Sequence, residues 1–287
     1  MPSSRKSWIS DQGAAAIWKF LLTLLLVAAI AYAFLVAFMY FAQRSMLFPG
    51  ATLGPGPVSD NPPWGERVTI ATGDGERLEA LHLQAEAGFP TAIFFHGNAD
   101  TITNYGFLGD ALSKRGIGLL ALSYRGYGGS TGSPSEIGLI IDGLAAFDWL
   151  SARHDGPIIL IGQSLGSAVA VAVAAEREMT GVVLISALDS MLALARRHYP
   201  FLPVGPLIRD PFRSDLCIGA VREPKLFLHG ARDTIIPLSH GRALFELAPE
   251  PKEFRVLEGY GHNDVWTFER AETVADFVET VAENAEN

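Results

Sequence analysis

Three polar side chains, far apart along the chain, have the types and surroundings needed for nucleophilic catalysis at a serine. The first is Ser164, in Gly162-Gln163-Ser164-Leu165-Gly166, which matches the pattern G-x-S-x-G. The motif follows the apolar run 157–161 and precedes the small-residue run 167–175, which predicts a strand, a sharp turn and a helix. Glycine at both flanking positions avoids clashes with the neighbouring strand and helix. We predict Ser164 as the nucleophile; the alternative is a glycine-rich loop that opens a helix.

A serine hydroxyl is a weak nucleophile at neutral pH, so a base must accept its proton and a third group must hold the base. After a strand–turn–helix nucleophile, the acid and then the histidine are expected later in the chain. His262 lies in the glycine-rich loop 259–264, between the last predicted strand and helix, and is the predicted base. Of the other late histidines, His229 directly follows a strand and should face the interior, whereas His240 should be exposed on an early helical turn.

Two aspartates satisfy the chain order for the acid. Asp233 lies just past the seventh predicted strand, and Asp189 lies just past the sixth. We favour Asp233, because it occupies the strand-end loop before the helix that leads to the histidine strand.

Acyl transfer at a serine also needs two backbone N–H groups that stabilise the developing oxyanion. The N–H of Leu165, at the start of the helix after the nucleophile, is one candidate. The second is the N–H of Asn98, in the loop 95–100 after the third predicted strand, where His96-Gly97 allows close backbone approach. An ordinary turn is the alternative for that loop. This chemistry requires no metal and no organic cofactor.

Short β-rich runs alternate with helical stretches, which predicts an α/β fold: a mostly parallel, eight-stranded sheet with helices on both faces, in one domain over residues 66–287. An antiparallel start is expected, because Gly73-Asp74-Gly75 is a hairpin signal. The predicted strands are 68–72, 78–85, 91–95, 118–123, 157–161, 182–185, 225–228 and 254–257, and the predicted helices are 102–114, 137–150, 165–176, 239–247 and 264–281.

One segment interrupts this alternation. Residues 187–222 contain ARRHYPFLPVGPLIRDPF, whose four prolines forbid a long regular helix. An insertion at this point is expected over the strand ends, where open α/β sheets bind ligands. Its apolar residues Tyr199, Phe201, Leu202 and Val204 are candidates for an acyl pocket, and packing of the loop on the domain is an equal alternative.

An uncharged run of 23 residues, 20–42, covers about 34 Å as a helix, enough to cross a hydrocarbon core of about 30 Å. We predict an uncleaved anchor; a cleaved signal peptide and a buried core helix are the alternatives. Three Lys/Arg precede the run and one follows it, so residues 1–19 are predicted to be cytoplasmic and the main domain to be outside, periplasmic in a Gram-negative cell. Residues 43–65, rich in Gly and Pro from residue 50 onward, are predicted to be a linker.

The net charge of −9 is unevenly distributed: residues 1–49 carry four Lys/Arg against one Asp, 4 − 1 = +3, which leaves −12 for the rest. An acidic main body argues against nucleic-acid binding, which needs a basic face. The single cysteine, Cys217, excludes an internal disulfide and a Cys-based zinc site, and is predicted to be a small buried side chain.

Five phrases in order, FFHGNAD, YRGYGGSTGSPSE, LIGQSLGSAVA, LHGARDTIIP and GYGHND, resemble α/β-hydrolases of the serine aminopeptidase-like group. The chain is most similar to the single-span serine hydrolases related to the mammalian α/β-hydrolase-domain proteins, over about residues 44–280. The resemblance implies a Ser-His-Asp hydrolase of esters or thioesters, often in acylated lipids or acyl-proteins. In the second phrase we interpret Arg125 as loop structure near the site.

Two other functions stay open: a peptidase of the same fold, and a catalytically silent, membrane-tethered binding module. Dehalogenase and epoxide-hydrolase chemistry is disfavoured, because it uses a carboxylate where this chain has Ser164. The expected partners are a small-molecule or lipid acyl substrate and the membrane; the sequence identifies no protein partner.

Overall fold

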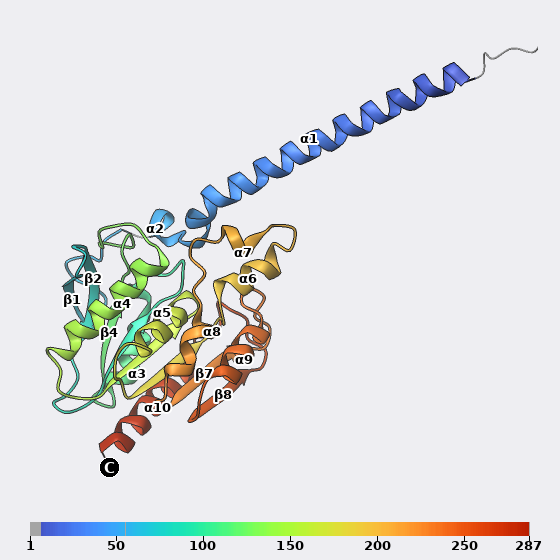
Figure 1. Cartoon of the computed structure of the whole chain (residues 1–287). Coiled ribbons are helices and arrows are strands. Elements are labelled where there is room, and N and C mark those ends of the chain that lie inside the picture. The colour runs from blue at the N-terminus through green and yellow to red at the C-terminus, as the bar shows by residue number, and fades with distance from the viewer. Residues whose placement is uncertain (1–6, 55, 287) are drawn as a thin grey trace, which may run out of the picture. The chain divides into compact units, whose positions relative to one another are not determined.

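The chain divides by its internal contacts into two units, residues 1–43 and 44–287. The computed structural model describes residues 7–54 and 56–286. The larger unit contains an eight-stranded sheet in the order β1-β2-β4-β3-β5-β6-β7-β8, with helices on both faces (Figure 1). Only β2 is antiparallel to its neighbours; all other pairings are parallel. The predicted fold class and antiparallel start are confirmed.

The strands are β1 (Glu66–Ala71), β2 (Arg77–Leu83), β3 (Thr91–Phe95), β4 (Gly118–Leu122), β5 (Ile158–Gln163), β6 (Gly181–Ile185), β7 (Lys225–Gly230) and β8 (Lys252–Leu257). All residues of β3 to β7 are buried, which explains their continuous apolar runs. Because these strands are parallel, the loops after β3, β5, β7 and β8 emerge at one edge of the sheet. The predicted site residues are therefore delivered to the same edge.

Helices cover the two faces separately. One core cluster contains residues of α4 (Glu136–Ser151), α5 (Leu165–Ala174) and α9 (Leu238–Leu247). A second cluster contains residues of α3 (Gly106–Ser113), which continues the 3-10 turn η1 (Ile102–Tyr105), and of α10 (Phe268–Glu286). The last helix, α10, begins four residues later than predicted, at 268 instead of 264. The Asp264 carboxylate accepts a hydrogen bond from Gly261 N–H (2.6 Å), so this residue closes a turn of the preceding loop.

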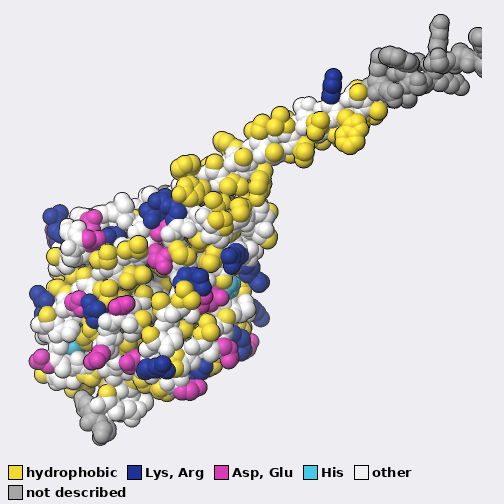
Figure 2. Space-filling model, in the orientation of Figure 1, with side chains coloured by type: hydrophobic (Ala, Val, Ile, Leu, Met, Phe, Trp, Pro, Cys, Tyr) yellow, Lys and Arg dark blue, Asp and Glu magenta, His cyan; other side chains and the backbone are white. Residues whose placement is uncertain are grey.

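The smaller unit contains most of α1 (Ser7–Leu47), which is longer than the predicted run 20–42. Its segment Gly13–Leu47 has a mean hydropathy of 2.7 over its most apolar window and is long and apolar enough to cross a membrane. Figure 2 shows apolar side chains along its surface, whereas the larger unit carries charges of both signs.

Most of the segment 43–65, which its Gly and Pro content predicts as a linker, packs on the larger unit. Arg44 onward belongs to the larger unit, and the segment includes the short helix α2 (Gly50–Leu53). Phe48 and Val58 are buried in the two core clusters, and Val58 N–H donates to the carboxylate of Glu79 at 3.0 and 3.1 Å. Burial of these two apolar side chains opposes the loss of conformational entropy that ordering the segment costs.

The insertion 187–222 lies between β6 and β7 and forms α6 (Met191–His198), α7 (Val204–Leu207), α8 (Ser214–Cys217) and the 3-10 turn η2 (Ile218–Ala220). Prolines separate these helices and keep them short, as the sequence predicts. Phe212 and Ile218 of the insertion are buried in the core cluster that contains α5. These two side chains therefore anchor the insertion on the face of the sheet that carries the nucleophile helix, α5.

Candidate active site

Ser164 occupies a strained turn between β5 and α5. Its backbone has φ 53° and ψ −119°, a conformation that a residue with a side chain rarely adopts. Its N–H donates to Ile185 O on the neighbouring strand (2.9 Å), and Ser167 donates from both N–H and Oγ to the Ser164 carbonyl. These contacts hold the turn, so the hydroxyl is presented at the carboxyl edge of the sheet.

The flanking glycines are required by close backbone contacts. A Cβ at Gly162 would lie 2.4 Å from Gly166 O, and a Cβ at Gly166 would lie 2.0 Å from Phe95 O on β3. No side chain fits at either position without moving a strand or the helix start. A side chain at either flanking position would therefore clash with the neighbouring strand or helix, which is the reason expected from the sequence pattern.

The structure brings Ser164, His262 and Asp233 together in one hydrogen-bonded chain. His262 Nε2 lies 3.0 Å from Ser164 Oγ, and its Nδ1 lies 2.7 Å from Asp233 Oδ2. An ionised carboxylate only accepts hydrogen bonds, so Nδ1 carries the proton and Nε2 is free to accept one from the serine. This tautomer is the one that a general base at a serine needs.

Asp233 is buried and held by main-chain donors. Its Oδ1 accepts from Ile235 N–H (3.0 Å) and Ile236 N–H (2.8 Å). Burial alone would raise the pKa of this carboxyl, but the hydrogen bond from His262 and the Ile236 N–H outweigh it, so the pKa of Asp233 is lowered. The carboxylate therefore stays charged beside the imidazole.

The loops that carry these side chains are joined to each other. Ala231 N–H donates to Leu257 O (3.0 Å), and Arg232 N–H donates to Tyr260 O (2.8 Å). A Cβ at Gly230 would lie 2.4 Å from Gly261 O, so the acid loop and the histidine loop pack backbone against backbone. The distance between acid and base is thus set by the main chain.

The remaining candidates of the same types lie outside this hydrogen-bonded chain, although His229 Nε2 is 3.5 Å from Asp233 Oδ2. Asp189 Oδ1 lies 2.6 Å from His240 Nδ1. His240 is buried, so the prediction that it is exposed was wrong. The residue that contacts His240, Asp189, lies 51 positions earlier in the chain, so the position of His240 on the helix alone does not reveal this burial. His229 faces the interior as predicted, its Nε2 bonds Ile236 O (2.9 Å), and burial lowers its pKa.

The two segments predicted to supply oxyanion donors both adjoin the nucleophile. Leu165 is the first residue of α5, so its N–H has no acceptor within the helix. In the loop after β3, a Cβ on Gly97 would lie 3.6 Å from Ser164 Cβ, which shows how closely this loop approaches the nucleophile. The next N–H along the loop belongs to Asn98.

Several supporting side chains escaped the sequence analysis. Gln163 Oε1 accepts from Tyr105 Oη (2.8 Å) and Trp266 Nε1 (2.7 Å), which fixes the residue before the nucleophile. Tyr124 Oη donates to His96 O (3.1 Å), and Tyr127 Oη donates to Asn98 Oδ1 (3.0 Å), which holds the loop after β3. The phrase YRGYGG contains both of the latter tyrosines, but no local pattern shows which loop they contact.

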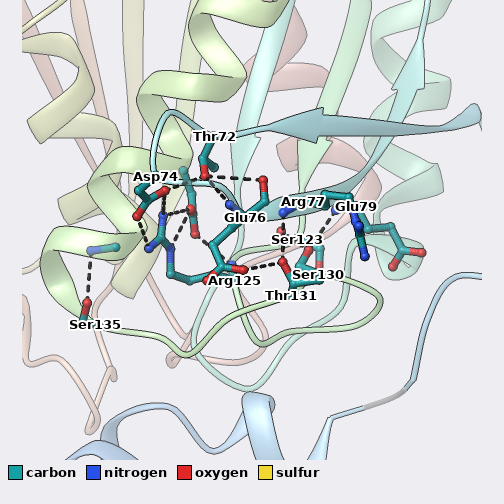
Figure 3. A network of polar contacts seen from close by, with 12 residues as sticks. Thr72, Asp74, Glu76, Arg77, Glu79, Ser123, Arg125, Ser130, Thr131 and Ser135 are labelled. Carbon is teal, nitrogen blue, oxygen red and sulfur yellow. Dashed lines mark hydrogen bonds and ion pairs between the residues drawn. The ribbon is translucent and has the colours of Figure 1, made fainter.

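Arg125 holds the loop that carries these tyrosines. It donates to buried Asp142 (2.8 Å) and to Asp74 in the β1–β2 hairpin (2.8 and 3.1 Å), as Figure 3 shows for Asp74. The hydrogen bonds from Arg125 lower the pKa of Asp74 to about 2. Thr131 of the same loop donates to Glu76. These contacts agree with the interpretation of Arg125 as loop structure.

Replacing Arg125 with methionine is expected to lower the free energy of unfolding by about 3–5 kcal/mol, because it leaves the Asp142 carboxylate, which is 0 % exposed, without its cation. The matched control is Arg177→Met, which breaks a surface pair whose side chains are 33 % and 54 % exposed and should cost about 0–1 kcal/mol. Urea unfolding of both variants makes the comparison. Equal losses would contradict the assignment of Arg125 as a buried structural cation.

The fold and the nucleophile turn define an α/β-hydrolase. The serine aminopeptidase S33 family profile matches residues 90–199. Among solved structures, the esterase domain of a Rhodothermus marinus protein is 26 % identical, with a TM-score of 0.59 over 76 % of this chain and 98 % of that one. A Pyrococcus furiosus esterase, 22 % identical, has a TM-score of 0.65 over 79 % of this chain and 98 % of its own, and shares the fold.

Curated relatives give the family. An uncharacterized protein of Mycobacterium tuberculosis (strain H37Rv) is 36 % identical over 245 residues, 83 % of this chain and 86 % of that protein. Alpha/beta hydrolase domain-containing protein 17B of Xenopus tropicalis is 34 % identical over 203 residues, 68 % of each chain. The chain belongs to the α/β-hydrolase family, and its esterase-like neighbours support a hydrolase.

Proposed function

We propose that the protein is a serine hydrolase that cleaves carboxylic esters or thioesters through an acyl-enzyme. Ser164 Oγ attacks the acyl carbonyl while His262 Nε2 accepts the hydroxyl proton, and Asp233 stabilises the resulting imidazolium. His262 then donates this proton to the leaving alcohol or thiol. Water, deprotonated by the same imidazole, hydrolyses the acyl-enzyme and regenerates Ser164.

The oxyanion of each tetrahedral intermediate is assigned to two main-chain donors, the N–H groups of Leu165 and Asn98. Both belong to segments adjoining the nucleophile, and the positive end of α5 adds to the stabilisation of negative charge there. Donors held by a folded backbone need little reorganisation when the charge develops.

The observation that carries the proposal is the continuous hydrogen-bonded chain from Asp233 through His262 to Ser164, on a fold shared with esterases. A silent binding module has no chemical need for a histidine in this tautomer between a buried carboxylate and a strained serine. The proposed substrates are small-molecule or lipid acyl compounds. The apolar insertion residues Tyr199, Phe201, Leu202 and Val204 are the proposed acyl-chain contacts.

The choice between ester and amide cleavage is tested with matched substrates. Hydrolysis of p-nitrophenyl esters and acyl thioesters of increasing chain length is compared with hydrolysis of aminoacyl p-nitroanilides, for the wild type and Ser164→Ala. We expect Ser164-dependent turnover of esters and thioesters with kcat/KM at least about 100-fold above that of the anilides. A preference for the anilides would favour the peptidase alternative instead.

We further propose that α1 anchors the protein in a membrane, with residues 1–19 cytoplasmic and the catalytic domain outside. Its length and mean hydropathy, and the excess of Lys/Arg before the apolar run, support this. The full chain should remain in the membrane pellet after alkaline carbonate extraction. External protease should degrade the catalytic domain in intact spheroplasts; complete protection of this domain would reverse the proposed orientation.

A further inference from the structure

The stretch that follows the apolar part of α1 is built firmly into the larger unit. The Arg44 guanidinium donates to both oxygens of Asp210 in the insertion, at 2.8 and 3.1 Å, and Asp210 also accepts from Glu136 N–H at 2.9 Å. Phe48, 1 % exposed, lies in the core cluster that contains Leu165, with its ring 6.3 Å from that of Phe212. Two separate contacts therefore fix where residues 44–48 lie.

Gly50, two residues later, lies directly on the loop after β3. A Cβ at this position would be 2.6 Å from Asn98 O and 2.4 Å from Cε1 of Tyr127. One of these atoms is main chain, and the other is the ring edge of a buried tyrosine, so neither can give way without a shift of the structure around it. The backbone of residue 50 thus packs directly against the main chain of Asn98.

Asn98 is held from its side chain as well. Tyr127 Oη donates to Asn98 Oδ1 (3.0 Å), so the tyrosine that contacts Gly50 also bonds the residue whose N–H we assign to the oxyanion. Tyr124, nearby in sequence, fixes His96 O in the same loop (3.1 Å). Gly50, Tyr127 and Asn98 are therefore one packed group.

From this juxtaposition we propose that residues 44–53 are a positioning element of the active site, which holds the Asn98 N–H at the oxyanion through Gly50 and Tyr127. The proposal rests on the proposed function, because it assigns a geometry to that donor. Residue 50 lies eight positions after the apolar run ends at Ala42, 50 − 42 = 8. A short, packed stretch of chain therefore connects the proposed membrane anchor to the catalytic loop.

The test uses the full-length protein with Gly50→Ala. The added methyl group should displace Asn98 or Tyr127, and kcat for a p-nitrophenyl ester should fall about 10- to 100-fold, somewhat less than the loss of an entire oxyanion donor. KM should change less than about twofold, because the displaced donor acts mainly on the tetrahedral state. The inhibition constant of a trifluoromethyl ketone, which forms a tetrahedral adduct, should rise in parallel with the fall in kcat/KM.

The matched control is Gly56→Ala, six residues away, where a Cβ has no atom within 4 Å. It should retain the kcat of the wild type. Tyr127→Phe, which removes only the bond to Asn98 Oδ1, should lower kcat about 2- to 10-fold with an unchanged KM. The pH profile of kcat/KM should stay the same in all three variants, because the Ser164–His262–Asp233 chain is untouched.

Active-site titration with a fluorophosphonate separates a change in rate from a loss of folded protein. Gly50→Ala with fewer titratable sites but a normal kcat per site would overturn the positioning role, as would a normal kcat with all sites present. Absence of Ser164-dependent turnover in the wild type is a different result, which would reject the proposed function itself and with it this role of the loop.

Discussion

Replacing Ser164 with alanine is expected to lower kcat for ester hydrolysis on the order of 10⁶-fold. The variant removes the hydroxyl oxygen that lies 3.0 Å from His262 Nε2, so no acyl-enzyme can form at this position. The N–H groups of Leu165 and Asn98 remain, and they should leave a residual acceleration of about 10³-fold over the uncatalysed reaction. Stopped-flow and long-time spectrophotometric assays cover this range.

Fluorophosphonate labelling supplies the second measurement for this prediction. The reagent phosphonylates an activated serine, so the wild type should be labelled and Ser164→Ala should not. Ser113→Ala is a suitable control, because Ser113 is an exposed residue of α3 whose hydroxyl donates to Asp110 O in the preceding turn. Equal labelling of the wild type and Ser164→Ala would end the case for Ser164 as the nucleophile.

Replacing Asp233 with asparagine should lower kcat about 10⁴-fold, the second-largest effect expected. The amide N–H can donate a hydrogen bond to Nδ1 and thereby favour the imidazole tautomer that has its proton on Nε2, which cannot accept from Ser164. The variant also removes the charge that stabilises the imidazolium. Because the Ile235 and Ile236 N–H groups still have one amide oxygen to bond, the fold should survive, and circular dichroism can verify this.

Asp189→Asn is the matched control for this prediction. Asp189 follows the neighbouring strand β6 and also contacts a histidine, His240, at 2.6 Å. Its replacement should keep kcat within about threefold of the wild type, although it can lower the melting temperature. The opposite result, a large loss in Asp189→Asn and a small one in Asp233→Asn, would transfer the role of the acid to Asp189.

Local sequence is sufficient for the features that arise within a few residues. The nucleophile turn is one: Gly162 is required by atoms of the helix start four residues later, and Ser164 lies between an apolar run and a small-residue run. All eight strands could be located from the sequence, and β3 to β7 give the clearest signal, because strands buried on both faces leave a continuous apolar run. Their ends differ by a few residues, since the last residues of β7 pair with β8 far along the chain.

The contacts between distant segments were decided only by the tertiary structure. Both Asp189 and Asp233 satisfy the chain order, and the choice between them depends on which strand end faces His262 across the sheet edge. His240 is buried and contacts Asp189, 51 residues away in the chain, whereas its position on the helix predicts exposure.

The segment 43–65 shows the same limit most clearly. Its Gly and Pro content predicts a linker, yet Phe48 is buried and Gly50 touches Asn98, which lies in a different part of the sequence. Composition measures how freely a segment can bend, but burial depends on what the rest of the chain offers to pack against. The sequence by itself therefore determined the elements and the residue types of the site, and the assembled sheet decided which of them meet.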